Sequence, residues 1–147
     1  MEIQLVNRND AETVRVAFKN VDGGGSVTTG YAVAIVTTAA SFDGISAVRR
    51  TAALTKTFHG VSTSDVAING FGKAVIYGYA ASIAISNVGT SITVTAGDVL
   101  IPGAVAGTHF SSVTDQALST QVYRYSVSGQ TTTISAQAWV SGYVKGF

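Results

Sequence analysis

Two histidines are the side chains in this sequence best suited to acid–base catalysis or to metal binding. His59 and His109 lie 50 positions apart, and each stands beside a turn-like segment. With Asp65 or Asp98 they would make a metal site or a base–acid pair if the fold brought them together. Their spacing does not favour this, and an isolated histidine is more commonly structural or solvated. We therefore predict no catalytic and no metal-binding residue among them.

The aspartates are the second group of residues to consider for catalysis, because glycosidases use a pair of acidic residues. Such an enzyme needs two carboxyl groups that converge on one groove. An aspartate in a turn, in contrast, accepts hydrogen bonds from nearby backbone amides. Four aspartates stand alone in turn-like contexts, namely Asp43, Asp65, Asp98 and Asp115. We interpret all four as turn residues.

The segment NGFGKAV at 69–75 has the general form of a phosphate-binding loop but departs from it at two positions. That loop requires a glycine five residues before its Gly-Lys pair and a serine or threonine after the lysine. Ala67 and Ala74 occupy these positions. The sequence also contains no Gly-X-Ser-X-Gly motif and no cysteine. These observations predict a protein that is not an enzyme and that binds no cofactor.

Aromatic residues gather late in the chain and leave three interpretations open. They are Tyr123, Tyr125, Trp139, Tyr143 and Phe147. Such a group is typical of a sugar-binding platform, of a core, or of an anchor in a subunit interface, where Tyr and Trp are favoured. Few polar residues of the kind a sugar site needs flank them, which favours the core or the interface.

The charge content is low, because charged residues make up 12% of the 147 residues and the net charge is +1. About 25% is usual for a soluble domain, so we expect neighbouring subunits to cover part of the surface. The nine basic residues are scattered, which argues against a nucleic-acid partner. No apolar run reaches membrane-spanning length and no secretory signal is visible, so we expect assembly in the cytoplasm and no membrane partner.

The elements that would position these residues are strands. Val and Thr are abundant, the 16 glycines suit tight turns, and no long window has helical periodicity. We predict an all-β, single-domain antiparallel β-sandwich or barrel. Residues 1–26, which end in the breaker DGGGS, are expected to form a short N-terminal arm or edge ribbon, and residues 27–147 the β-domain.

Three local expectations follow from the strand patterns. Residues 73–86 alternate strictly, with Tyr77 and Tyr79 on a bulky, core-like face and small residues on the other, and a bend is expected at Gly78. Residues 61–70 predict a turn with a short helix. The segments before and after Ser-Gly-Gln at 128–130 predict a hairpin.

The sequence from FHGVSTSDVAING to SITVTAGDVLIPGAVAG resembles the small β-rich capsid decoration (cement) proteins of tailed bacteriophages. The resemblance covers roughly residues 45–110. The matching residues are Phe58, Gly60, Val61, Asp65, Gly70, Ala96, Gly97, Asp98 and Leu100. It implies a structural virion protein made in the bacterial host cytoplasm. Such a protein binds the outer capsid surface, bridges subunits of the major capsid protein, and is often a homotrimer.

Two other classes of protein fit the same residues. One is a tail-fibre or spike domain that binds host surface glycan through the late aromatic residues. The other is a small hydrolase on a β-scaffold. Loss of glycan binding on Trp139→Ala would favour the first, and turnover of a substrate the second.

Overall fold

The computed structural model describes residues 12–36, 45–49, 59–85, 92–95, 99–102, 110–112, 123–124, 132–134 and 137–145. These residues form strands and no helix, which confirms the all-β prediction. In that part of the chain there is accordingly no helix of a length and apolarity that would cross a membrane. The strands are β1 Val14–Asn20, β2 Ala32–Ile35, β3 Ser46–Arg49, β4 His59–Ser62, β5 Phe71–Ile85, β6 Ile92–Val94, β7 Val99–Pro102, β8 Phe110–Ser112, β9 Tyr123–Arg124, β10 Thr132–Ile134 and β11 Ala138–Lys145.

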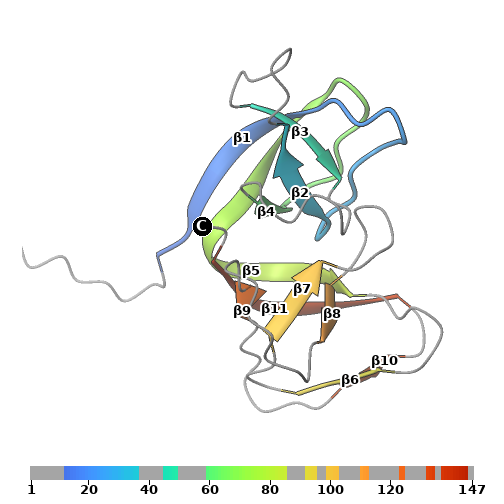
Figure 1. Cartoon of the computed structure of the whole chain (residues 1–147). Coiled ribbons are helices and arrows are strands. Elements are labelled where there is room, and N and C mark those ends of the chain that lie inside the picture. The colour runs from blue at the N-terminus through green and yellow to red at the C-terminus, as the bar shows by residue number, and fades with distance from the viewer. Residues whose placement is uncertain are drawn as a thin grey trace, which may run out of the picture.

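Five strands pair in a closed circuit in the upper half of the molecule (Figure 1). The pairings run from β1 to β3, β2, β4 and β5, and β5 returns to β1. In the lower half, β5 continues into pairings with β11 and β8, β8 pairs with β7, and β7 with β9, while β6 and β10 form a separate ribbon. The sheet is mixed, because β1 and β3 are parallel, as are β5 and β8. The purely antiparallel arrangement expected from the sequence is therefore corrected.

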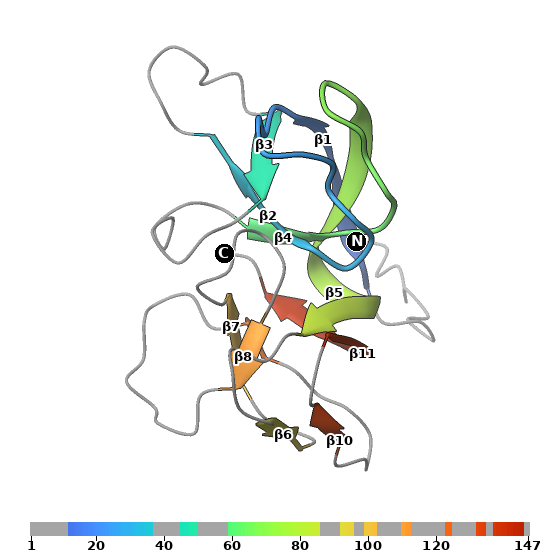
Figure 2. The same ribbon diagram turned by 90° about the vertical axis from the view of Figure 1, so that its right-hand side faces the viewer.

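β5 is the longest strand and belongs to both halves. Its first part pairs with β1 and β4, its second part with β11, and its last residue with β8. The chain bends at Gly78, whose φ of 101° lies in a region that other residues rarely adopt. The bend expected there is confirmed, and the two views show β5 turning from the upper half into the lower one (Figures 1 and 2).

The two faces of β5 are not distributed as the alternation predicts. Tyr77 and Tyr79 are 41% and 44% exposed, while Ala80 on the small face is 4% exposed. The interpretation of these tyrosines as core residues is therefore wrong. The register of β5 shifts twice, against Val14 and Arg15 of β1 and against Val140 and Gly142 of β11. Each shift inserts one extra residue into β5. Between the two shifts the small residues Gly78 and Ala80 are buried, so the tyrosines lie on the exposed face.

Two apolar clusters hold the fold together. Adjacent residues of β5 enter different clusters, Ala74 the first and Val75 the second, because consecutive side chains of a strand point to opposite faces. The first cluster lies among the strands of the closed circuit and comprises Phe18, Val27, Val33, Ala47, Val66 and Ala74. The second joins the upper and lower halves and comprises Ala32, Val61, Val75, Ala80, Ile83, Ile85, Val94, Leu100 and Val144.

β1 is more deeply buried and more fully paired than an arm or edge ribbon would be. It lies between β5 and, at its end, β3, and its side chains Phe18 and Asn20 are 1% and 0% exposed. The described part of the expected 1–26 segment thus supplies a strand and core residues to the closed circuit. Its alternation, with Val16 and Phe18 on one side, is that of a half-buried strand. Residues 1–11 of the expected arm lie outside the described residues.

The expected short helix is corrected, while the expected hairpin falls mostly outside the described residues. Residues 63–70 contain turns and one bridge between Val66 and Val27, and no helix. The turn before β5 closes through a hydrogen bond from Gly70 N–H to the carbonyl of Ala67, with Asn69 at a φ of 62°. Of the segments expected to form the late hairpin, the described residues show β9 paired with β7 and β10 with β6. The turn at 128–130 itself lies outside the described residues.

Candidate functional site

The feature that sets this molecule apart is a row of exposed aromatic side chains on β5 and β11, here called the aromatic face. It consists of Tyr77, Tyr79, Trp139 and Tyr143, which are 41%, 44%, 52% and 44% exposed. Tyr79 and Tyr143 are cross-strand partners, and their rings meet edge-on with centroids 6.0 Å apart. Aromatic pairs prefer this geometry, so the two rings hold each other in place.

The alternation along β11 places Trp139 and Tyr143 on one side. Between these two residues, Gly142 is buried and Val140 packs against the second apolar cluster. Beyond Tyr143, Val144 belongs to that cluster and is 3% exposed. The register shift after Val140 adds the extra residue to β5, so the outward order of β11 is uninterrupted. The aromatic face therefore stands on a ladder of two paired strands whose opposite side is core.

Trp139 also connects the two halves of the molecule. Its Nε1–H donates to the carbonyl of Thr29 over 3.3 Å, in the segment between β1 and β2. A Cβ on Gly30, whose φ is 86°, would lie 3.2 Å from Cδ1 of Trp139 and 3.0 Å from the backbone nitrogen of Ala84. Only glycine lets this segment lie so close to the ring and to β5.

Gly78 fixes the position of the two tyrosines that flank it. A Cβ at this residue would overlap the carbonyl oxygen of Glu12 and lie 2.8 Å from Cα of Thr13. The start of β1 therefore packs directly on the backbone at the bend. The bend and this close approach together direct Tyr77 and Tyr79 outward on either side of a buried glycine.

The residues singled out for acid–base or metal chemistry are not brought together in the described structure. His59 begins β4, while His109 lies outside the described residues, as do Asp43, Asp98 and Asp115. No group of three or more histidine or carboxylate residues that would hold a metal occurs within the described ranges. Asp65 is exposed and accepts hydrogen bonds from the backbone N–H and the hydroxyl of Thr29, at 2.7 and 2.9 Å. These bonds lower the pKa of Asp65, and they tie it to a distant segment and not to the nearby amides that the interpretation as a turn residue supposed.

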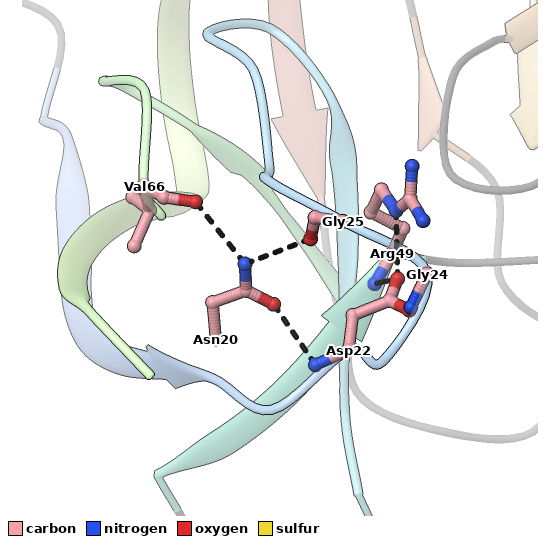
Figure 3. Close-up of polar contacts among 6 residues, drawn as sticks. All are labelled: Asn20, Asp22, Gly24, Gly25, Arg49 and Val66. Atoms are coloured by element: carbon pink, nitrogen blue, oxygen red, sulfur yellow. Dashed lines mark hydrogen bonds and ion pairs between the residues drawn. The ribbon is translucent and has the colours of Figure 1, made fainter. Parts of the chain in front are cut away.

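The most elaborate polar arrangement in the described residues is structural, and we call it the polar clasp (Figure 3). Its centre is the fully buried Asn20, whose Nδ2 donates to the carbonyls of Gly25 and Val66, both over 3.1 Å. Oδ1 of Asn20 accepts from the N–H of Asp22 over 3.0 Å. One side chain thus ties the end of β1 to the glycine loop and to the turn before β5.

Asp22 completes the polar clasp through Arg49 of β3. Its Oδ2 accepts from Nε of Arg49 over 2.7 Å and from the N–H of Arg49 over 3.1 Å, and its Oδ1 accepts from the N–H of Gly24 over 2.7 Å. Burial raises the pKa of the Asp22 carboxyl, but the hydrogen bonds from Arg49 and Gly24 and the charge of Arg49 outweigh it, so the pKa lies below 3.8. Both oxygens of this carboxylate accept hydrogen bonds within the fold, so Asp22 has a structural role here.

Of the late aromatic residues, Trp139 and Tyr143 lie on the aromatic face. The side chains of the other three are outside the described part of the chain. Tyr123 lies in β9, while Tyr125 and Phe147 lie outside the described residues. Sequence reasoning missed the partners of Tyr143, because it assigned Tyr77 and Tyr79 to the core. The signal that would have found them is Gly78, a bend between two tyrosines, where regular alternation is interrupted.

Comparison of the chain with protein-family models, with curated proteins and with solved structures found no match.

Proposed function

We propose that this protein is a structural protein of a virion, which binds the outer surface of a phage capsid and stabilises the shell by bridging subunits of the major capsid protein. The observation that carries the binding role is the aromatic face. Tyr and Trp side chains are enriched where proteins meet other proteins, and they dominate the energy of such contacts. Here four of them are 41–52% exposed on a paired, rigid ladder.

The choice of a capsid as the partner is supported by the resemblance over residues 45–110 and by the composition. A chain with 12% charged and 46% hydrophobic residues is suited to a surface that neighbours cover. We further propose a homo-oligomer, with a trimer as the expected state on the shell. Binding that is specific to the assembled shell stabilises it by mass action.

The experiment uses shells assembled from the major capsid protein encoded in the same genome. The protein is mixed with undecorated shells, the shells are sedimented, and bound protein is quantified against total shell protein. The proposal expects saturable binding at a fixed ratio to capsid subunits and a higher temperature of shell disruption. Shells that neither retain the protein nor gain heat resistance would contradict it.

A second candidate function is a tail-fibre or spike domain that binds host surface glycan. The exposure of Trp139 and Tyr143 on one side of β11 favours it, because sugars stack on exposed rings. A glycan array separates the two candidates. Glycan binding that is lost on Trp139→Ala, with no binding to shells, would select the glycan-binding function.

A further inference from the structure

The outer side of the β1–β5 ladder carries a second unusual surface, which we call the basic strip. On β1, Phe18 and Asn20 point into the fold, so Arg15 and Lys19 point away from it. Lys19 is the cross-strand partner of Phe71 on β5, and Lys73 is the partner of Ala17. The basic strip therefore comprises Arg15, Lys19, Lys73 and Phe71, and it occupies the two strands at the left of the upper half in Figure 1.

The positive charges of the basic strip are not neutralised within the described structure. None of Arg15, Lys19 and Lys73 forms an ion pair with a carboxylate among the residues that the structure describes. Of the described aspartates, Asp22 is bound to Arg49 and Asp65 to Thr29. Neighbouring cations on one face of a ladder repel each other, so this arrangement does not stabilise the fold. Its concentration in a chain with few charges points to a partner.

An apolar anchor stands beside these charges. Phe71 is 70% exposed, more than any other large apolar side chain in the described ranges. It lies directly opposite Lys19, within about 5.5 Å between Cβ atoms for a ladder pair. A phenylalanine in water next to cations is suited to a partner that offers an apolar pocket rimmed by carboxylates.

From this juxtaposition we infer that the basic strip docks on an acidic protein surface, with Phe71 inserted in an apolar pocket and the three cations facing Asp or Glu side chains. Under the proposed function, which this inference extends, that surface belongs to the capsid shell. The strip and the aromatic face then contact different parts of the assembly.

A protein surface fits the strip better than the other polyanions. Proteins that bind duplex DNA through its backbone make about 6–10 phosphate contacts, and polybasic membrane-binding segments have about 4–8 cations. The strip offers three cations, with the uncharged Ala17 between them. Charge complementarity over a small area with one apolar anchor is the pattern of a protein interface.

The test compares two triple variants with equal change in net charge. Arg15→Gln, Lys19→Gln and Lys73→Gln remove three positive charges from the strip. Ser26→Glu, Ser64→Glu and Gln137→Glu add three negative charges at exposed positions elsewhere. Shell binding is measured at low and at high salt, and thermal unfolding verifies that both variants fold. We expect the strip variant to bind at least about tenfold more weakly and with a flatter salt dependence, and the control variant to bind like the wild type.

A second measurement makes the result independent of the shell. Wild type and both variants are tested on immobilised poly-L-glutamate, on duplex DNA and on phosphatidylserine vesicles. Retention of the wild type on poly-L-glutamate, with loss in the strip variant alone, supports the inference even if shells are not bound, in which case only the proposed function fails. Equal shell binding by both variants, or stronger retention on DNA or vesicles, overturns the inference.

Discussion

The polar clasp and the aromatic face differ in the burial of their side chains. In the clasp, Asn20 is fully buried and each of its polar atoms has a partner, while Asp22 is bound to Arg49 and Gly24. On the aromatic face, four large aromatic residues are 41–52% exposed, although the other side of their two-stranded ladder is core. The polar residues of the clasp thus close the fold, and the aromatic residues left exposed are those for which we propose a binding role. Substitutions in the two regions should therefore affect different properties.

The largest effect on folding is expected from Asn20→Ala. The substitution leaves the carbonyl of Gly25 and the N–H of Asp22 without a partner, and the Val66 carbonyl keeps only its bond from the N–H of Val27. Buried unpaired groups are costly, so we expect the free energy of unfolding to fall by about 3 kcal/mol. Urea denaturation measures it, with the exposed Ser64→Ala as control. A loss as small as that of the control would show that the clasp does not hold the end of β1.

Gly78→Ala should affect both regions of the comparison, because the bend joins them. A side chain at a φ of 101° is strained, and it would overlap the carbonyl of Glu12. We expect a loss of about 2 kcal/mol in the free energy of unfolding. Thermal unfolding provides the measurement. A variant as stable as the wild type would mean that β5 tolerates another course between its two tyrosines.

Asp22→Asn should destabilise the protein by about 1.5 kcal/mol at neutral pH, because it removes a charge-assisted bond to Arg49. The pKa of Asp22 is lowered by folding, so its contribution is complete above the ordinary value of 3.8 and is lost as the pH falls through the folded-state pKa. Unfolding at pH 7 and below pH 3.8 should therefore show the difference between wild type and variant shrinking in acid. A difference that is constant over this range contradicts the role of the carboxylate.

The sequence predicted the fold where side chains alternate regularly. The all-β class is as predicted, and Gly78 bends β5 as expected. Residues Ala32, Val33 and Ala34, an apolar run in the sequence, are 1–4% exposed. Of the three interpretations of the late aromatic residues, the exposure of Trp139 and Tyr143 argues against the core, and the interface and the sugar platform stay predictions.

The failures have a common physical cause in long-range contacts. Which face of β5 is buried depends on how β1, β4 and β11 pack against it, so Tyr77 and Tyr79 were assigned to the core from their size although they are exposed. The segment at 63–70 has helix-capping residues, yet Asp65 bonds to Thr29 from a distant part of the chain. Long-range hydrogen bonds of this kind outweigh local propensity.

The smallest effect on folding and the largest on binding are expected from the double variant Tyr79→Ser and Tyr143→Ser. It removes the edge-on ring pair from the exposed side of the ladder, so the free energy of unfolding should fall by about 1 kcal/mol. Ile68→Ser, an exposed apolar residue outside the aromatic face, is the matched control.

The central claim, that the Tyr79–Tyr143 pair of the aromatic face serves binding more than folding, is tested most directly by measuring urea unfolding and shell binding on these same preparations. The account predicts that the double variant unfolds nearly as the wild type does but binds shells at least about a hundredfold more weakly, while Ile68→Ser binds normally. Wild-type affinity in a folded double variant, or a loss of stability as large as that of Asn20→Ala, would contradict it.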